Sequence, residues 1–202
     1  WYAEHYRDAR RGQRRGDITP FYLFHPEVPA RIRALLPRAK MIVLLRDPVE
    51  RALSQYFHSR RLGLEPLELE AAFAAEPERL ADADETLRCS ESHRSHQQHS
   101  YLSRSRYEQQ LPRYQGLFGA EQLLVLRSED LFEQPRLVWG KVIDFLGLEV
   151  EPLPDLGLRR LYGGEGESLR VPILFKRQLL ENLQFTYRAM QQRYLLNWPV
   201  LS

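Results

Sequence analysis

The stretch MIVLLRDPVERALSQYFH, residues 41–58, decides the expected fold, because a strand ends and a helix begins within it. Its first five residues form an uninterrupted apolar run between helical patterns, which predicts a strand buried on both faces of a parallel sheet. Next, Asp47 suits an N-cap, Pro48 suits the first helical position, and Glu50 completes a capping-box arrangement. The helix is therefore predicted to start directly at the carboxyl end of the strand.

A second apolar run, residues 122–126, predicts another buried strand of the same sheet. Helical patterns surround the two strands and cover residues 26–36, 101–118, 135–146 and 171–196. Strands that are separated by helices imply right-handed crossover connections. The sequence therefore predicts an α/β fold with a central parallel sheet flanked by helices.

The remaining segments carry weaker signals. Residues 1–15 are predicted to be helical, and residues 21–24 to form a short strand or an extended loop. An acidic helix is expected over residues 65–88, then a mobile polar loop over 89–100. Residues 148–170 are rich in proline and glycine, so they are predicted to be largely irregular.

Length and composition indicate one soluble globular domain spanning residues 1–202, with 43% hydrophobic and 28% charged residues. The net charge is only +2, and the arginine-rich start lacks the features of a nucleic-acid-binding module, so no nucleic-acid partner is predicted. Cys89 is the single cysteine, which fits a reducing compartment, and a cytoplasmic location is predicted. No apolar run approaches the roughly 18 residues of a membrane span. The sequence leaves the oligomeric state open.

An anion site is predicted where the first strand meets its helix. Ligands of open α/β sheets bind at the carboxyl ends of strands, and a helix N-terminus offers free N–H groups and partial positive charge. Arg46 supplies a guanidinium suited to phosphate, while Arg51, Ser54 and His58 recur at helical spacing along one face. Taken singly, Arg46 could pair with a carboxylate, Ser54 could allow close packing, and His58 could be a solvated helix residue.

The run from Lys40 to His58 resembles the 3′-phosphate-binding motif of sulfotransferases that use 3′-phosphoadenosine 5′-phosphosulfate (PAPS), especially the bacterial and heparan-sulfate-type enzymes. The resemblance implies a P-loop-NTPase-like sulfotransferase fold. It also implies that Arg46 and Ser54 hold the 3′-phosphate of PAPS, the donor cosubstrate. By the same resemblance, His58 faces the acceptor, as a histidine does in heparan N-sulfotransferases.

The resemblance extends over nearly the whole chain. The segments similar to the family are Trp1-Tyr2, Gly16-Asp17-Ile18-Thr19-Pro20-Phe21-Tyr22, Ser105-Arg106-Tyr107 with Leu111, residues 124–131, and Asn197-Trp198-Pro199. Ile18 stands where the family commonly has lysine. The match at Tyr107 implies a place near the nucleotide, and the family's basic loop before the final helix makes Arg170 and Lys176 candidates for binding the 3′-phosphate.

The family's 5′-phosphosulfate loop, a Lys-x-Gly-Thr-Thr-like segment, and its glutamate base fall before the equivalent of Trp1, so the match is to an N-terminally truncated domain. Transfer needs positive charge at the leaving oxygen and a base, and His58 alone is a candidate base. We expect these 202 residues alone to be inactive. The predicted function is transfer of a sulfuryl group to a hydroxyl or amine of an acceptor such as a saccharide. The alternative is a non-catalytic or decayed nucleotide-binding module.

Two other patterns point away from metal and nucleoside triphosphate chemistry. His93, His96 and His99 recur every third residue, but neither Cys89 nor Glu91 completes a recognisable ligand set, so no metal is predicted. The sequence contains no Gly-x-x-x-x-Gly-Lys-Ser/Thr, and a Gly-rich stretch at residues 163–166 lacks a preceding strand. The aromatic residues of the final helix, Phe175, Phe185, Tyr187 and Tyr194, are predicted to be core contacts.

Overall fold

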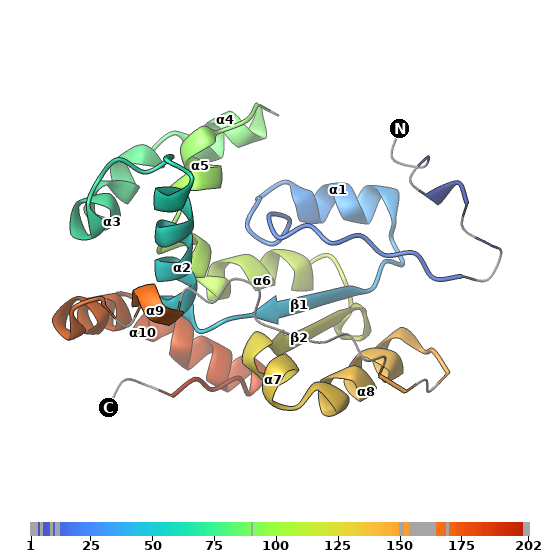
Figure 1. Ribbon diagram of the computed structural model, residues 1–202. Helices are drawn as coiled ribbons and strands as arrows, with labels where there is room; N and C mark the ends of the chain where they lie inside the picture. The colour runs from blue at the N-terminus through green and yellow to red at the C-terminus, as the bar shows by residue number, and fades with distance from the viewer. Residues whose placement is uncertain are drawn as a thin grey trace.

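The computed structural model describes residues 4, 6–8, 10, 13–89, 91–149, 152–153, 165–168 and 170–199. Within this part of the chain two parallel strands, β1 (Met41–Leu45) and β2 (Leu123–Arg127), pair along their whole lengths. Helices surround them, so the fold is mainly helical around a small parallel sheet (Figure 1). The predicted parallel pairing is confirmed, but the described sheet has only two strands.

The helices follow much of the expected order. They are α1 (Val28–Leu35), α2 (Pro48–Arg61), α3 (Leu69–Arg79), α4 (Ala83–Arg88), α5 (Arg94–Gln98), α6 (Tyr107–Gln115), α7 (Ser128–Glu133), α8 (Pro135–Leu146), α9 (Glu165–Ser168) and α10 (Ile173–Tyr194). Short 3₁₀ turns cover Ser103–Ser105 and Ala120–Gln122. The bounds of β1 and α8 match the prediction, and α10 confirms the long final helix. No helix among the described residues is long and apolar enough to cross a membrane.

Some local predictions differ from the structure. The helical prediction for residues 65–88 is confirmed as two helices, α3 and α4, whereas residues 21–24 form turns and not the short strand that was one of two alternatives. The described residues among 1–15 form no α-helix, and the rest of that segment lies outside the described residues. Most of 148–170, including the Gly-rich stretch from 163 to 164, also lies outside them.

The polar stretch 89–100, predicted to be a mobile loop, is partly helical and partly buried. Five of its residues form α5, and the side chains of His96 and Ser100 are buried. The His96 ring stacks on Phe24 with ring centroids 4.0 Å apart, while the Ser100 hydroxyl donates to the His96 carbonyl at 2.8 Å. These contacts with a distant turn and along the chain fold the stretch inward, which composition alone does not reveal.

The two faces of β1 have different surroundings. Val43 and Leu45 pack into a core with residues of α6 and α10 and with Trp198 near the end of the chain. On the other face Ile42 and Leu44 are 38% and 47% exposed. The prediction of a strand buried on both faces is therefore wrong for the part of the chain that the structure describes, because α7 and α8 contact β2 and leave this face of β1 partly open.

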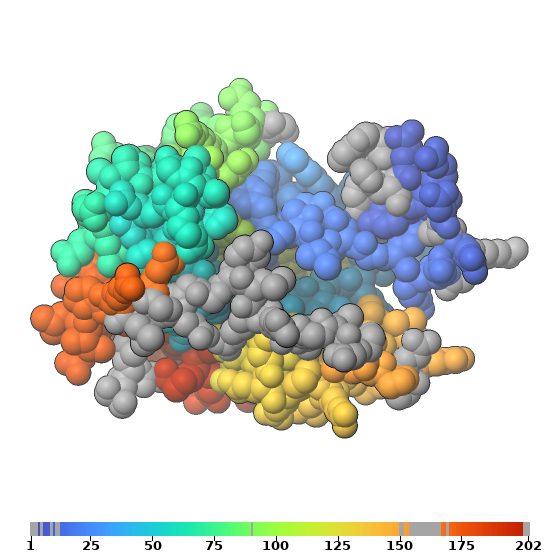
Figure 2. Space-filling view, viewed as in Figure 1, coloured from blue at the N-terminus to red at the C-terminus, as the bar shows by residue number. Residues whose placement is uncertain are grey.

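A second core joins α2 to α10 and α3. It contains Leu53, Tyr56, Phe73, Phe175 and other apolar side chains, and the α3 region lies beside the start of α10 (Figures 1 and 2). Phe175 is thus a core residue as predicted, whereas Phe185 is 64% exposed and the prediction for it is wrong. Together the two cores fix α2 against the end of β1, which sets the position of the candidate site.

Candidate functional site

The candidate site begins with the cap of α2. The Asp47 carboxylate accepts a hydrogen bond from the Glu50 N–H at 2.9 Å, and Pro48 stands in the first turn, as predicted. The capping-box prediction that the Glu50 side chain accepts from the Asp47 N–H is wrong, because this N–H donates to Glu129 Oε1 at 2.9 Å. The side chain of Glu50 instead accepts from Ser168 and Lys176.

Three distant side chains hold the turn between β1 and α2. The Tyr107 hydroxyl donates to the Arg46 carbonyl at 3.0 Å, the Tyr187 hydroxyl donates to the Asp47 Oδ2 at 2.8 Å, and Glu129 accepts from the Asp47 N–H. Burial raises the pKa of both tyrosines, so the two hydroxyls stay protonated and able to donate. Burial also raises the pKa of Asp47, against the hydrogen bonds that it accepts. The backbone that carries Arg46 is therefore fixed from α6, α7 and α10.

The predicted phosphate ligands remain accessible in this arrangement. The Arg46 side chain is 31% exposed, and its guanidinium lies 3.9 Å from the Glu50 carboxylate, which is the outer limit of an ion pair. Ser54 is partly buried on α2, and no hydrogen bond joins its hydroxyl to another described residue. His58 lies one helical turn farther along the same face, and it is exposed.

Arg51 does not share the site, although its spacing placed it on the same helix face. Its guanidinium points inward and donates to the Ser105 hydroxyl at 2.6 Å, to the Gln55 side chain at 2.6 Å and to the Tyr101 carbonyl. Burial lowers the pKa of Arg51 to about 10, which leaves it charged at neutral pH. Arg51 therefore fixes the connection between α5 and α6, and the prediction that it faces an anion is wrong.

The two basic candidates near α10 have different positions. Lys176 is buried, and its ammonium donates to the Glu50 carboxylate at 3.1 Å and to the Ser168 hydroxyl at 2.9 Å. Arg170 is exposed, and α9, which precedes it, contacts α2. Glu50 thus brings the cations of Arg46 and Lys176 to one carboxylate at the start of α2.

Sequence reasoning missed Glu129 and Tyr187 as parts of this turn. Glu129 belongs to the Glu-Asp-Leu match after β2, which was the available signal, but its partner Asp47 stands 82 residues earlier. Tyr187 was assigned to the core, and no local pattern shows that its hydroxyl reaches Asp47. Both contacts depend on how α7 and α10 pack against the end of β1.

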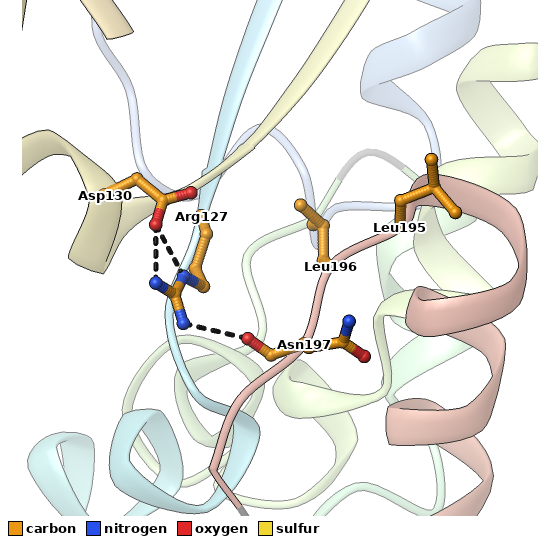
Figure 3. A pocket seen from close by; sticks show the side chains of 5 residues that line it. All are labelled: Arg127, Asp130, Leu195, Leu196 and Asn197. Carbon is orange, nitrogen blue, oxygen red and sulfur yellow. Dashed lines mark hydrogen bonds and ion pairs between the residues drawn. The ribbon is translucent and has the colours of Figure 1, made fainter. Parts of the chain in front are cut away.

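A surface hollow lies beside the end of β2 and is lined by Arg127, Asp130, Leu195, Leu196 and Asn197 (Figure 3). The Arg127 guanidinium donates to Asp130 Oδ1 at 2.6 and 2.8 Å and to the Asn197 carbonyl at 2.9 Å. Because these partners engage the cation, the hollow offers an anion less than the end of β1 does.

The three spaced histidines have separate partners. His93 Nε2 lies 2.9 Å from the Asp82 carboxylate, His96 stacks on Phe24, and His99 Nε2 lies 3.1 Å from the Leu64 carbonyl. Among the residues with described positions, no group of three or more histidine, cysteine or acidic side chains could hold a metal ion. The histidine spacing is therefore explained by packing and capping.

The junction between β1 and α2 lies at the carboxyl end of a parallel strand, which is where open α/β proteins bind their ligands. The sequence profile described as "Sulfotransferase domain" matches residues 21–160, which is more than half of the chain. The chain belongs to the sulfotransferase family.

Individual relatives agree with this assignment. Human heparan sulfate glucosamine 3-O-sulfotransferase 3B1 is 30% identical over 151 residues, which are 74% of this chain and 35% of the relative. The bifunctional heparan sulfate N-deacetylase/N-sulfotransferase 1 of Xenopus laevis is 32% identical over 120 residues, 59% of this chain and 13% of the relative. The chain thus spans about a third or less of the length of these curated relatives.

A solved structure gives the same fold. The crystal structure of a sulfotransferase from Alicyclobacillus acidocaldarius matches with a TM-score of 0.62 and 28% sequence identity. The match covers 91% of this chain and 69% of that one. The sulfotransferase fold predicted from the resemblance is therefore confirmed.

Proposed function

We propose that this chain is the donor-binding part of an enzyme that transfers a sulfuryl group from PAPS to a hydroxyl or amine. The observation that carries the proposal is the end of β1 in a sulfotransferase-family chain, where Arg46 precedes the capped start of α2 and Ser54 lies farther along the same helix. The N–H groups at the start of α2 are already paired within the fold, so the donors left for a phosphate with two negative charges are the Arg46 guanidinium and the Ser54 hydroxyl.

In this proposal Arg46 and Ser54 bind the 3′-phosphate of the donor, and the Tyr107 hydroxyl donates a hydrogen bond to the Arg46 carbonyl. Arg170 adds positive charge beside the phosphate. Lys176 acts on the site indirectly, because it pairs with the Glu50 carboxylate that Arg46 also approaches. The 3′-phosphate is distant from the reacting sulfur, so this binding energy positions the donor for transfer.

The transfer itself is an in-line displacement. The acceptor oxygen or nitrogen attacks sulfur, the bond from sulfur to the 5′-phosphate oxygen breaks, and 3′,5′-adenosine bisphosphate leaves. We propose that His58 takes the acceptor proton, since its exposed imidazole lies one turn beyond Ser54. The cytoplasmic location and the absence of a metal remain predictions.

The names of the two relatives describe 3-O-sulfotransfer to heparan sulfate glucosamine and N-sulfotransfer. They support an acceptor with a hydroxyl or an amine, such as a saccharide. A second candidate is a nucleotide-binding module without catalysis, because Arg46 and Ser54 act in binding alone and His58 is the one candidate base in this sequence. Turnover of PAPS in the presence of an acceptor distinguishes the two.

Calorimetric titration with 3′,5′-adenosine bisphosphate and with 5′-AMP tests the donor site, in this chain and in the full-length gene product. We expect binding that requires the 3′-phosphate and is lost in the Arg46→Ala/Ser54→Ala double variant. The matched control is Arg136→Ala/Ser92→Ala, which makes the same truncations at two exposed residues, one on α8 and one between α4 and α5. Equal affinity for the two nucleotides, in this chain and also in the full-length gene product, would refute the proposal.

A further inference from the structure

The carboxylate of Glu129 is unusual among the groups that hold the β1–α2 turn, because it serves two donors from different parts of the chain. Its Oε1 accepts from the Asp47 N–H at 2.9 Å, and its Oε2 accepts from the Trp198 indole N–H at 2.9 Å and the Ser128 hydroxyl at 3.4 Å. Trp198 is buried, so its N–H depends on this acceptor. Glu129 therefore ties the turn to the C-terminal segment.

The bond to Asp47 acts on the residue next to Arg46. The N–H that Glu129 accepts belongs to the peptide that joins Arg46 to Asp47, and the carbonyl of this same peptide accepts from the Tyr107 hydroxyl. Both polar groups of one peptide plane are thus fixed by side chains of other helices. A fixed peptide plane sets the direction in which the Arg46 side chain leaves the backbone.

A carboxylate suits this position better than an amide. Each oxygen of Glu129 faces a donor, and a glutamine side chain has only one acceptor oxygen. In either orientation its NH₂ group would oppose the Asp47 N–H or the Trp198 N–H. The Glu129 charge also lies near another carboxylate, Asp47, whose pKa is raised by burial and further by this charge.

We propose that Glu129 is a positioning residue for donor binding, which orients Arg46 toward the 3′-phosphate through the shared peptide plane. The inference rests on the proposed function, since it concerns the same phosphate site. It adds a residue that does not touch the nucleotide and that couples the site to Trp198. Substitution of Glu129 should therefore lower the preference for a 3′-phosphate more than it lowers nucleotide binding as a whole.

The test measures the ratio of affinities for 3′,5′-adenosine bisphosphate and 5′-AMP in the full-length gene product. We expect Glu129→Gln to reduce this ratio about tenfold, the size expected when one charge-assisted hydrogen bond is lost. The matched control is Glu133→Gln, which removes the same charge from the same helix at a side chain that is 54% exposed. The control should leave the ratio unchanged.

Two further variants separate positioning from a loss of stability. Trp198→Phe leaves the Asp47 bond intact and should change the ratio less than about twofold, because only the second acceptor oxygen loses its donor. Added to Glu129→Gln, it removes the donor that the amide opposes, so the double variant should recover the ratio. A purely structural role predicts that the double variant is worse than either single one.

The outcomes distinguish the inference from the function on which it rests. A wild-type protein without a 3′-phosphate preference overturns both. A preference that Arg46→Ala abolishes and Glu129→Gln preserves overturns this inference alone. A ratio that rises in Glu129→Gln also overturns it, because removal of a nearby negative charge favours the more highly charged ligand and would show that orientation plays no part.

Discussion

Two arginine–glutamate pairs in this molecule join the same two kinds of side chain and differ in structure. Arg79 contacts Glu65 through two hydrogen bonds of 2.5 and 3.1 Å, and the Glu65 side chain is completely buried. Arg46 lies 3.9 Å from Glu50, and both side chains are 31% exposed. The first pair is satisfied within the fold, whereas in the second Glu50 accepts from Ser168 and Lys176 and the Arg46 guanidinium is left for a ligand. The geometry of a pair, and not its composition, separates a stabilising contact from a binding site.

Truncation of the buried pair should have the largest effect on stability. We expect Arg79→Ala to lower the free energy of unfolding by about 3–5 kcal/mol, because it leaves the buried Glu65 charge without its main partner. Urea denaturation followed by circular dichroism measures this change. A loss below about 1 kcal/mol, as at an exposed pair, would show that the two pairs do not differ as described.

Acid should reveal the same pair through Glu65. Burial acts to raise its pKa, but the hydrogen bonds from Arg79, Tyr101 and the Leu67 N–H outweigh it and lower the pKa from 4.5 to about 2. Since the folded pKa is the lower one, the stabilisation is complete above pH 4.5 and is lost as the pH falls toward 2.

The expected loss of unfolding free energy is about 3 kcal/mol, because the pKa of Glu65 is lower in the folded than in the unfolded protein. It is measured as the difference in unfolding free energy between the wild type and Glu65→Gln at several pH values. Taking the difference cancels the acid sensitivity of His96, whose pKa burial lowers to about 3. A difference that stays constant from pH 5 to pH 2.5 would contradict the assignment.

Arg46→Ala should show the opposite behaviour to Arg79→Ala. We expect it to weaken binding of 3′,5′-adenosine bisphosphate by about 2 kcal/mol, roughly 30-fold, as for one charge-assisted contact. Its cost in unfolding free energy should stay below about 1 kcal/mol, since the ion pair is long and partly exposed. The nucleotide affinity of a folded Arg79→Ala protein should equal that of the wild type.

The smallest expected effect concerns the cap that supports Arg46. Asp47→Ala should cost about 1–2 kcal/mol of stability, because the Glu50 N–H and the Tyr187 hydroxyl lose their acceptor. Asp47→Asn keeps an acceptor for the Glu50 N–H. It also removes a carboxylate whose pKa is raised by burial, so it should cost less stability than the alanine variant. Thermal denaturation of both variants orders them, and the reverse order would argue that the charge of Asp47 stabilises the turn.

Much of the site could be predicted because its signals are local. The apolar run of β1, the Asp47 cap and the arginine between them are adjacent in sequence, and each acts through its own backbone or the next turn. The family resemblance then added roles for Ser54 and His58 that spacing alone left open. Whether those two residues act as proposed awaits the binding and activity measurements.

The errors share a cause. Arg51 has the same helical spacing as Ser54, yet Ser105 and the Tyr101 carbonyl draw its side chain inward. His96 lies in a polar stretch, yet Phe24 covers its ring. In each case the deciding partners stand 50 or more residues away, so local periodicity carried no information about them.

The sequence by itself determined where β1 ends, where α2 begins, and that an arginine stands between them, since capping and strand propensity depend on neighbouring residues. Only the tertiary structure decided which side chains fix that turn and which cations stay accessible. Tyr107, Glu129 and Tyr187 reach it from three helices, and Glu50 takes Lys176 as its partner. The physical reason is that a hydrogen bond between distant residues forms only after the helices that carry them have packed.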